Sequence, residues 1–570
     1  MLLLLFLFVF FLSSCDPGIT TSSELNLSNS QLVKNESILY SDLSNKFTTG
    51  DQYLFIKDIK LVNQRSLSFS LGWNASWRAG DAFDAAWVFI KQKTKDGVWE
   101  HAVLRQGSSK LINNQSSDQA LPNRSITPNG IGMIIHREEN GQGDNNWNIS
   151  VEMDKDFDPA NTEFRIFGLE MVHIPSGAFE LGTLKRERSR REELTPGAGG
   201  APYNPFYTFS EKAPDNYGGV FKVSSEGPLE IGEEEGFLFW KDANIPGTNT
   251  FSGKPEGTLS AKFPKGFKGF YQMKYELSQQ EYCAFLNTLT AQQQEARDLS
   301  KTIEFNRPIA DYRNAIVYTD GLFRTSRPHR PCNFISWLDG QAYADWAGLR
   351  HMTELEFEKS CRGPEKAIYR EYVWGVSEIE QPENMRFCET FMNSTNLATE
   401  ETGSETIDGN VHASMFSYRN FIDVCTQKGN FYDPKSNGCR SFRGGDGGRG
   451  PVRKGIFGVQ SSGDRILAGA SYYGAMELGG NLQEPVVTVG HPSGRKFEGS
   501  HGDGKLTPEG FSDNLDWQPL NDEYAFGGRG GCWQFHENHA RISDRFKGLR
   551  TNPNRRASHI GFRGVISDWQ

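Results

Sequence analysis

The stretch ISWLDGQAYADWAGLRHMTELEFEKSCRG, residues 335–363, decides the fold of this chain. Its first part, LDGQAYADWAG (338–348), has helical spacing, and Gly348 stands where a glycine commonly ends a helix. In its second part Thr353 is followed three residues later by Glu356, the pattern of a capping box that opens a helix. The stretch therefore predicts two short helices in succession.

Three glutamates crowd the start of the second predicted helix, at Glu354, Glu356 and Glu358. Carboxylates in this number suggest acid chemistry as one interpretation. The positive end of a helix also stabilises negative charge in its first turn. We therefore expect a structural role for these three side chains.

Five further segments accompany this stretch in a fixed order along the chain: GLEMVHIPSGAFELG (168–182), MKYELSQQEYCAFL (273–286), AMELGGNLQE (475–484), RGGCW (529–533) and GFRG (561–564). In this order they resemble the formylglycine-generating-enzyme, or sulfatase-modifying-factor, domain family. The resemblance implies an α+β fold of the C-type-lectin-like class over residues 168–570. Two long polar segments, 183–262 and 376–467, would be insertions in that domain. A further helix is expected over EYCAFLNTLTAQQQEA (281–296), with Leu277-Ser278 as its cap region.

The family's signature chemistry is expected to be absent. Catalytic members bind copper through two cysteines shortly after the RGGSW-like segment, and those places fall here on Phe535 and Ala540. Neither side chain can form the thiolate that Cu(I) selects. The resemblance therefore implies the fold but no copper site.

A calcium site is implied by the resemblance at the turn ELGGNLQE. Its ligands would be Glu477, the carbonyl groups of Gly480 and Leu482, and Glu484. Two carboxylates with carbonyls and waters supply the hard oxygens that calcium prefers. Glu477 departs from the usual Asn or Asp, and an ordinary turn with solvated carboxylates is the alternative.

In this family, residues 533–560 would form an exposed ligand-facing surface or an active-site wall. Aromatic residues and arginine are typical of interface hot spots, and the segment is rich in charged side chains. The expected ligand or partner surface consists of Trp533, His536, Glu537, Arg541, Asp544, Arg550 and Arg555. Internal salt bridges that hold loops together are the alternative for the arginines, and the resemblance implies structural roles for Arg545 and Arg563.

The N-terminus has the pattern of a lipoprotein signal. Residues 2–12 are almost wholly apolar, and Leu-Ser-Ser-Cys follows, with Cys15 as the expected lipidated residue after a signal peptide of residues 1–14. The apolar run is short for a membrane span. Residues 15–50 are polar without a lasting period and indicate a tether.

Residues 51–167 are expected to form a β-sandwich of the immunoglobulin or fibronectin type, with a barrel as the alternative. Short alternating segments bounded by turn residues carry this prediction. They are 53–62, 66–73, 85–93, 99–105, 130–138, 146–154 and 162–171.

The net charge of the chain limits the classes of partner that it is expected to bind. The formal net charge of −10 argues against a nucleic acid or an anionic membrane held by broad electrostatics. An exported protein can form disulfides, and Cys425 with Cys439 is the expected local pair.

Two classes of function follow from these features. The first is a non-catalytic lipoprotein whose domain binds a protein partner or a glycan in an outer-membrane assembly. At domain level it resembles lipoproteins of the gliding and type IX secretion machinery of Bacteroidetes-type bacteria. The alternative is a metal-dependent oxidoreductase with an unorthodox site, for which Cys532, His536 and His539 are the candidate ligands. The missing cysteine pair favours the first class.

Overall fold

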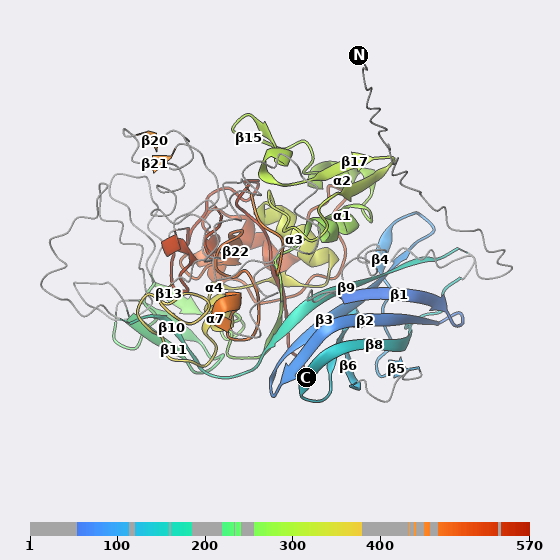
Figure 1. Ribbon diagram of the computed structural model, residues 1–570, viewed down its shortest axis with the longest axis horizontal. Coiled ribbons are helices and arrows are strands. Elements are labelled where there is room, and N and C mark those ends of the chain that lie inside the picture. The colour runs from blue at the N-terminus through green and yellow to red at the C-terminus, as the bar shows by residue number, and fades with distance from the viewer. Residues whose placement is uncertain are drawn as a thin grey trace, which may run out of the picture.

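The computed structural model describes residues 54–112, 120–158, 161–184, 219–232, 234–240, 256–378, 432–433, 438–439, 450–455, 465–533, 537–545 and 547–569. Strands dominate it, and its helices are short (Figure 1). The predicted signal peptide, Cys15 and the tether lie outside the described residues, as does Cys425 of the predicted disulfide.

The N-terminal region is built of strands. Each of the seven predicted segments contains one, and the short strands β5 and β6 were not predicted from the sequence. The bounds are β1 (Leu54–Leu61), β2 (Ser66–Ala79), β3 (Ala82–Lys93), β4 (Trp99–His101), β5 (Lys110–Leu111), β6 (Pro122–Ile126), β7 (Gly132–Arg137), β8 (Gly141–Glu152) and β9 (Glu163–Ile174).

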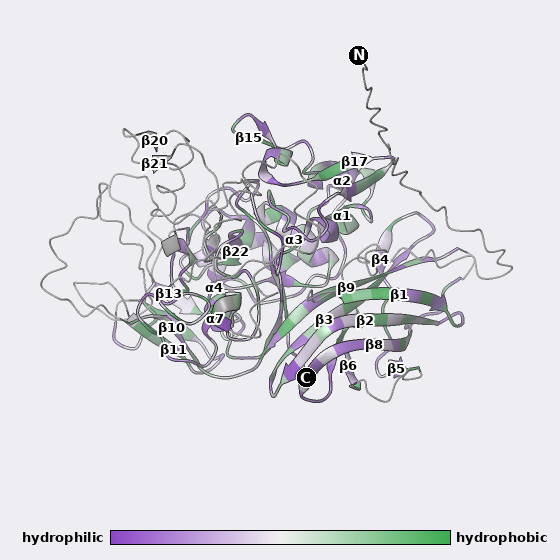
Figure 2. Ribbon diagram, in the orientation of Figure 1, coloured by the Kyte–Doolittle hydropathy of each residue, from purple (hydrophilic) through white to green (hydrophobic). Residues whose placement is uncertain are grey.

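These strands pair in two groups. In one, β2 lies between β1 and β8, and β5 continues from β8; in the other, β3 pairs with β4, β7 and β9, and β6 continues from β7. The end of β2 pairs with the start of β3, which joins the two groups in one sheet. One hydrophobic cluster draws buried side chains from both groups, among them Trp73, Trp147 and Ile166. Figure 2 shows hydrophobic and hydrophilic stretches on these strands. Buried and partly exposed residues alternate along β8, whereas β3, β7 and β9 are buried over most of their length.

Strand β9 joins this region to the rest of the chain. It pairs with β3 on one side and with β14 (Phe270–Met273) on the other, and the sheet continues through β24 (Gly564–Ser567) to β19 (Arg350–His351). The predicted boundary between residues 167 and 168 lies inside β9. The two predicted domains therefore share a strand and a sheet.

The largest hydrophobic cluster also spans both regions. It includes Trp87 of β3 together with Trp346 and Phe562 from the C-terminal part. The Trp87 indole nitrogen donates a hydrogen bond to the Ala347 carbonyl at 2.8 Å. In Figure 1 the C-terminus accordingly lies beside the N-terminal strands.

The helix predicted over 281–296 is two helices, so the prediction of one continuous helix is wrong. Ser278 caps α1 (Gln279–Leu286), within the predicted cap region, and Thr290 opens a second capping box for α2 (Ala291–Arg297). The Asn287 side chain breaks the helix, because its amide oxygen and nitrogen bond the backbone of Phe323 at 2.8 and 2.9 Å.

The two helices of the 335–363 stretch are present as α3 (Trp337–Trp346) and α4 (Glu354–Arg362). Gly348 has φ +69° just beyond α3, the left-handed conformation that glycine adopts readily. Thr353 caps α4 in a capping box with Glu356, as predicted.

The segment 183–262 is partly built into the domain. Within it, β11 (Gly219–Val223) pairs with β10 (Phe179–Thr183), and β12 (Leu229–Ile231) pairs with β13 (Gly257–Leu259). The remaining elements are β15 (Ile303–Glu304), β16 (Arg307–Pro308), η2 (Ile309–Tyr312), β17 (Ile316–Thr319), β18 (Leu322–Thr325), β20 (Tyr432–Asp433), β21 (Gly438–Cys439), α7 (Arg465–Ala468), β22 (Glu484–Val487), α8 (Pro492–Arg495), η5 (Leu515–Asn521), β23 (Phe526–Arg529) and η6 (Glu537–Ala540).

Candidate functional site

Helix α4 holds the C-terminal segment in place through buried ion pairs. The Glu358 carboxylate accepts hydrogen bonds from Arg529 at 2.7 Å and Arg545 at 2.5 Å. Glu354 accepts from the same two arginines at 3.2 and 3.0 Å. All four side chains are almost fully buried. The glutamates of α4 are therefore structural, and the arginines fix the chain around β23.

The electrostatics of Glu358 confirm that it stays ionised. Burial acts to raise the pKa of this carboxyl, but Arg545, Arg529 and Arg362 outweigh it and hold the pKa at about 2. A carboxylate this strongly stabilised is a poor proton donor near neutral pH. It is not a general-acid candidate.

Phe535 and Ala540 stand at the positions where the family has its copper-binding cysteines, and the structure describes only one of them. Phe535 lies outside the described residues. Ala540 is fully buried and belongs to a hydrophobic cluster that includes Phe357, Leu478 and Ile542. An apolar methyl group therefore occupies this position, packed among other apolar side chains.

Three of the residues expected on an exposed surface are buried, which corrects that expectation. Trp533 is 1% exposed, and its indole nitrogen donates to the Ser558 carbonyl at 3.0 Å. Arg541 stacks on the Tyr372 ring at 4.0 Å. Asp544 lies 3.2 Å from His539. Packing against the domain interior decides these positions, which a count of aromatic and charged residues does not reveal.

Two other residues of the expected surface keep contact with solvent. Arg555 is exposed and Arg550 is partly exposed. His536 lies outside the described residues, and for Glu537 the structure describes the backbone alone, at the start of η6. The described part of the expected surface is therefore reduced to the two arginines.

The expected calcium turn has two buried carboxylates. Glu477 Oε1 accepts the Gly455 amide at 2.7 Å, and Glu484 Oε1 accepts from Arg563 Nε at 2.7 Å. The second oxygen of each carboxylate is buried without a hydrogen-bond partner. Burial raises the pKa of both groups, that of Glu477 to about 7. Each carboxylate therefore keeps one buried oxygen unsatisfied, and calcium at this turn stays a prediction.

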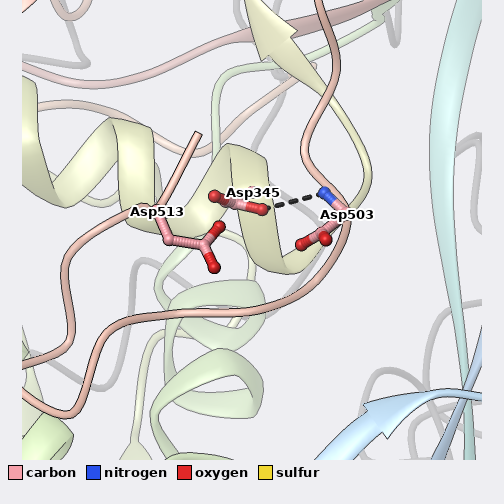
Figure 3. A group of neighbouring side chains, drawn as sticks. All are labelled: Asp345, Asp503 and Asp513. Atoms are coloured by element: carbon pink, nitrogen blue, oxygen red, sulfur yellow. Dashed lines mark hydrogen bonds between the residues drawn. The ribbon is translucent and has the colours of Figure 1, made fainter. Parts of the chain in front are cut away.

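A second acidic group was not predicted from the sequence. Asp345 of α3 lies beside Asp503 and Asp513, and one oxygen from each lies within 4.8 Å of the others (Figure 3). Asp345 Oδ1 accepts the Asp503 amide at 2.9 Å. The ammonium group of buried Lys91 lies nearby, and Asp345 and Asp503 oppose the lowering of its pKa by burial. The lysine offsets part of this negative charge, and we assign no ligand to the group.

Comparison with known proteins agrees with this architecture. The model of the sulfatase-modifying factor enzyme 1-like domain matches residues 241–568, more than half of the chain. The chain belongs to this family.

Curated relatives of the family match the chain over short regions. Formylglycine-generating enzymes of Thermomonospora curvata and Bos taurus are 32% and 31% identical over 93 and 115 residues, each 16% of this chain. A hercynine oxygenase of Mycobacterium tuberculosis is 43% identical over 49 residues, 8% of this chain. These regions span 29%, 30% and 12% of the relatives' own lengths, so the chain matches less than a third of each.

The family match begins at residue 241, whereas the sequence resemblance begins at residue 168. The structure explains why the earlier residues still belong to the same core. Trp240 is buried, and its indole nitrogen donates to Glu354 at 3.0 Å, so the segment ahead of the match contacts the same buried network as Arg529.

Proposed function

We propose that this chain is a non-catalytic, exported lipoprotein whose sulfatase-modifying-factor-like domain binds a protein partner or a glycan. The assembly it serves would lie at the outer membrane or cell surface and be of the secretion, gliding or nutrient-uptake type. The observation that carries the proposal is Ala540: where the resemblance expects a copper cysteine, the chain has a buried methyl group. A methyl group cannot ligate copper.

The thiols that the structure describes offer no ready substitute. Burial raises the pKa of Cys283, Cys332 and Cys361, so these groups stay protonated near neutral pH. Cys532 is fully buried as well. The alternative, a metal-dependent oxidoreductase with an unorthodox site, has Cys532, His536 and His539 as candidate ligands. His536 lies outside the described residues, and His539 Nδ1 lies 3.2 Å from Asp544 Oδ1.

The attachment to the membrane is part of the proposal. Lipidation of Cys15 after signal cleavage would anchor the mature protein to the outer membrane, on its periplasmic face or at the cell surface. Among the residues that the structure describes, no helix is both long and apolar enough to cross a membrane.

We also propose that the N-terminal strands are a β-sandwich of the immunoglobulin or fibronectin type. The pairing in two groups around one shared hydrophobic cluster supports this class.

Copper binding tests the proposal directly. The purified soluble region, incubated with Cu(I) under reducing conditions and then desalted, should retain no stoichiometric copper by elemental analysis. A matched variant carrying Phe535→Cys and Ala540→Cys should retain more, because it restores both expected ligands. Stoichiometric copper in the unmodified chain would support the oxidoreductase instead.

Calcium should stabilise the protein through Glu477 and Glu484. A ligand that binds only the folded state adds about 2.7 kcal/mol at a hundred times its dissociation constant, so the melting temperature of EGTA-stripped protein should rise when calcium is added. Glu477→Gln should remove this rise, whereas Glu498→Gln, at a half-exposed carboxylate, should retain it. An unchanged melting temperature in demonstrably stripped protein would eliminate the site.

A further inference from the structure

Four basic side chains gather beside strand β23. The chain from residue 547 to 550 runs along that strand: the Gly528 amide donates to the Lys547 carbonyl at 2.7 Å, and the Arg550 amide donates to the Phe526 carbonyl at 2.9 Å. The loop that follows brings two further basic residues to the same place. We call this group the basic cluster: Lys547, Arg550, Arg555 and His559.

The four side chains lie close enough to influence one another electrostatically. Burial lowers the pKa of His559, and Arg550, Arg555 and Lys547 lower it further. Burial, Arg550 and Arg555 lower the pKa of Lys547, whereas Cys532 and Asp544 oppose this lowering. Repulsion between the cationic groups Lys547, Arg550 and Arg555 is unfavourable, and a bound anion would offset part of it.

Arg550 carries donor groups that the described residues leave unsatisfied. Its Nε and Nη2 atoms are buried without a hydrogen-bond partner. Burial and Arg555 lower its pKa to about 10, and Cys532 is the one group that opposes them. Elsewhere in the domain the buried arginines Arg529, Arg545 and Arg563 each bind a carboxylate.

The difference between Arg550 and the arginines that bind carboxylates indicates that an anionic ligand binds at Arg550. A guanidinium group presents several N–H donors in one plane, a geometry that matches the oxygens of a carboxylate, sulfate or phosphate. Leaving such donors buried and unsatisfied is costly, and an oxyanion would satisfy them. We propose that the basic cluster is a binding site for an oxyanion group carried by the ligand of this domain.

This inference deepens the proposed binding function, because it names the chemical class that the domain recognises. An acidic ligand would approach from the side of exposed Arg555 and place its anionic group on Arg550. The overall charge of −10 gives no general attraction for anions, so recognition would depend on this local cluster.

Inorganic anions test the site on the full-length purified protein. Sulfate, phosphate and acetate are titrated separately by calorimetry, with sodium chloride of equal ionic strength as the reference. At least one oxyanion should bind above the chloride background, and the strongest of the three identifies the group. Arg550→Gln should weaken binding about tenfold or more, since a charge-assisted hydrogen bond contributes roughly 1.5–3 kcal/mol.

Two further variants keep the test decisive if Arg550→Gln impairs folding. Arg555→Gln removes an exposed charge that also repels Arg550, so it should weaken binding without lowering the melting temperature. Arg324→Gln, at an exposed arginine of β18, should leave anion binding unchanged. Equal binding by wild type and by both cluster variants, or no binding above chloride, would overturn the inference. Both overturning results concern anion binding alone, so they can be distinguished from a failure to find a protein or glycan partner.

Discussion

Replacing Glu358 with glutamine is expected to lower the free energy of unfolding by about 3–5 kcal/mol, the usual cost of removing one partner from a buried ion pair. The substitution keeps the shape of the side chain but leaves Arg529 and Arg545 facing each other with less negative charge between them. Urea denaturation, monitored by tryptophan fluorescence, measures the difference in the free energy of unfolding between wild type and Glu358→Gln.

A surface carboxylate provides the control. Glu498 pairs with Lys262 at 2.8 Å, but both side chains are at least half exposed. Exposed ion pairs contribute little to stability, so Glu498→Gln should keep the wild-type midpoint. A Glu358→Gln protein as stable as wild type would show that the buried network does not hold the domain together.

The stability supplied by Glu358 should also depend on pH in a defined direction. Its folded pKa of about 2 lies below the ordinary value of 4.5, so the unfolded chain takes up the proton first as the pH falls. Its contribution should be complete above pH 4.5 and disappear toward pH 2. The gap between wild type and Glu358→Gln should therefore narrow across this range.

Replacing Trp87 with alanine is expected to cost about 3–5 kcal/mol, as for other large aromatic residues removed from a core. Trp87 is fully buried and bonds the Ala347 carbonyl, so the substitution removes both packing and a hydrogen bond between the N-terminal strands and helix α3. Strand β9 pairs with β3 of the N-terminal region and with β14 of the C-terminal region. We therefore expect the two regions to lose stability together.

Calorimetry distinguishes this outcome from independent unfolding. The variant should show one transition at a lower temperature, and Val103→Ala, at a side chain that is 44% exposed, should match wild type. Two separated transitions, with the C-terminal one unchanged, would mean that residues 51–167 fold as an independent domain.

Local signals in the sequence predicted local structure well. The cap region at Leu277-Ser278, the capping box at Thr353 and the helix end at Gly348 depend on residues a few positions apart, and the structure confirms all three. The break between α1 and α2 was missed because Asn287 bonds Phe323, and no local pattern reveals that contact.

The candidate sites depend on contacts between residues that are far apart in the sequence, and local sequence patterns do not predict such contacts. Glu354 meets Arg545 across 191 positions, so its charge was attributed to the helix end alone. The burial of Trp533 was likewise invisible, because an aromatic residue suits an interface or a core equally well. The unsatisfied guanidinium of Arg550 becomes evident only when its surroundings are seen.

The most direct test of the proposed binding function is extraction of the native protein from its own cells in mild detergent, followed by quantitative mass spectrometry and glycan analysis of what co-purifies. We predict a protein partner or a glycan at fixed molar ratio, which is lost when Arg550 is replaced. A chain that purifies alone, and captures neither proteins nor glycans from its own cells, would contradict the account.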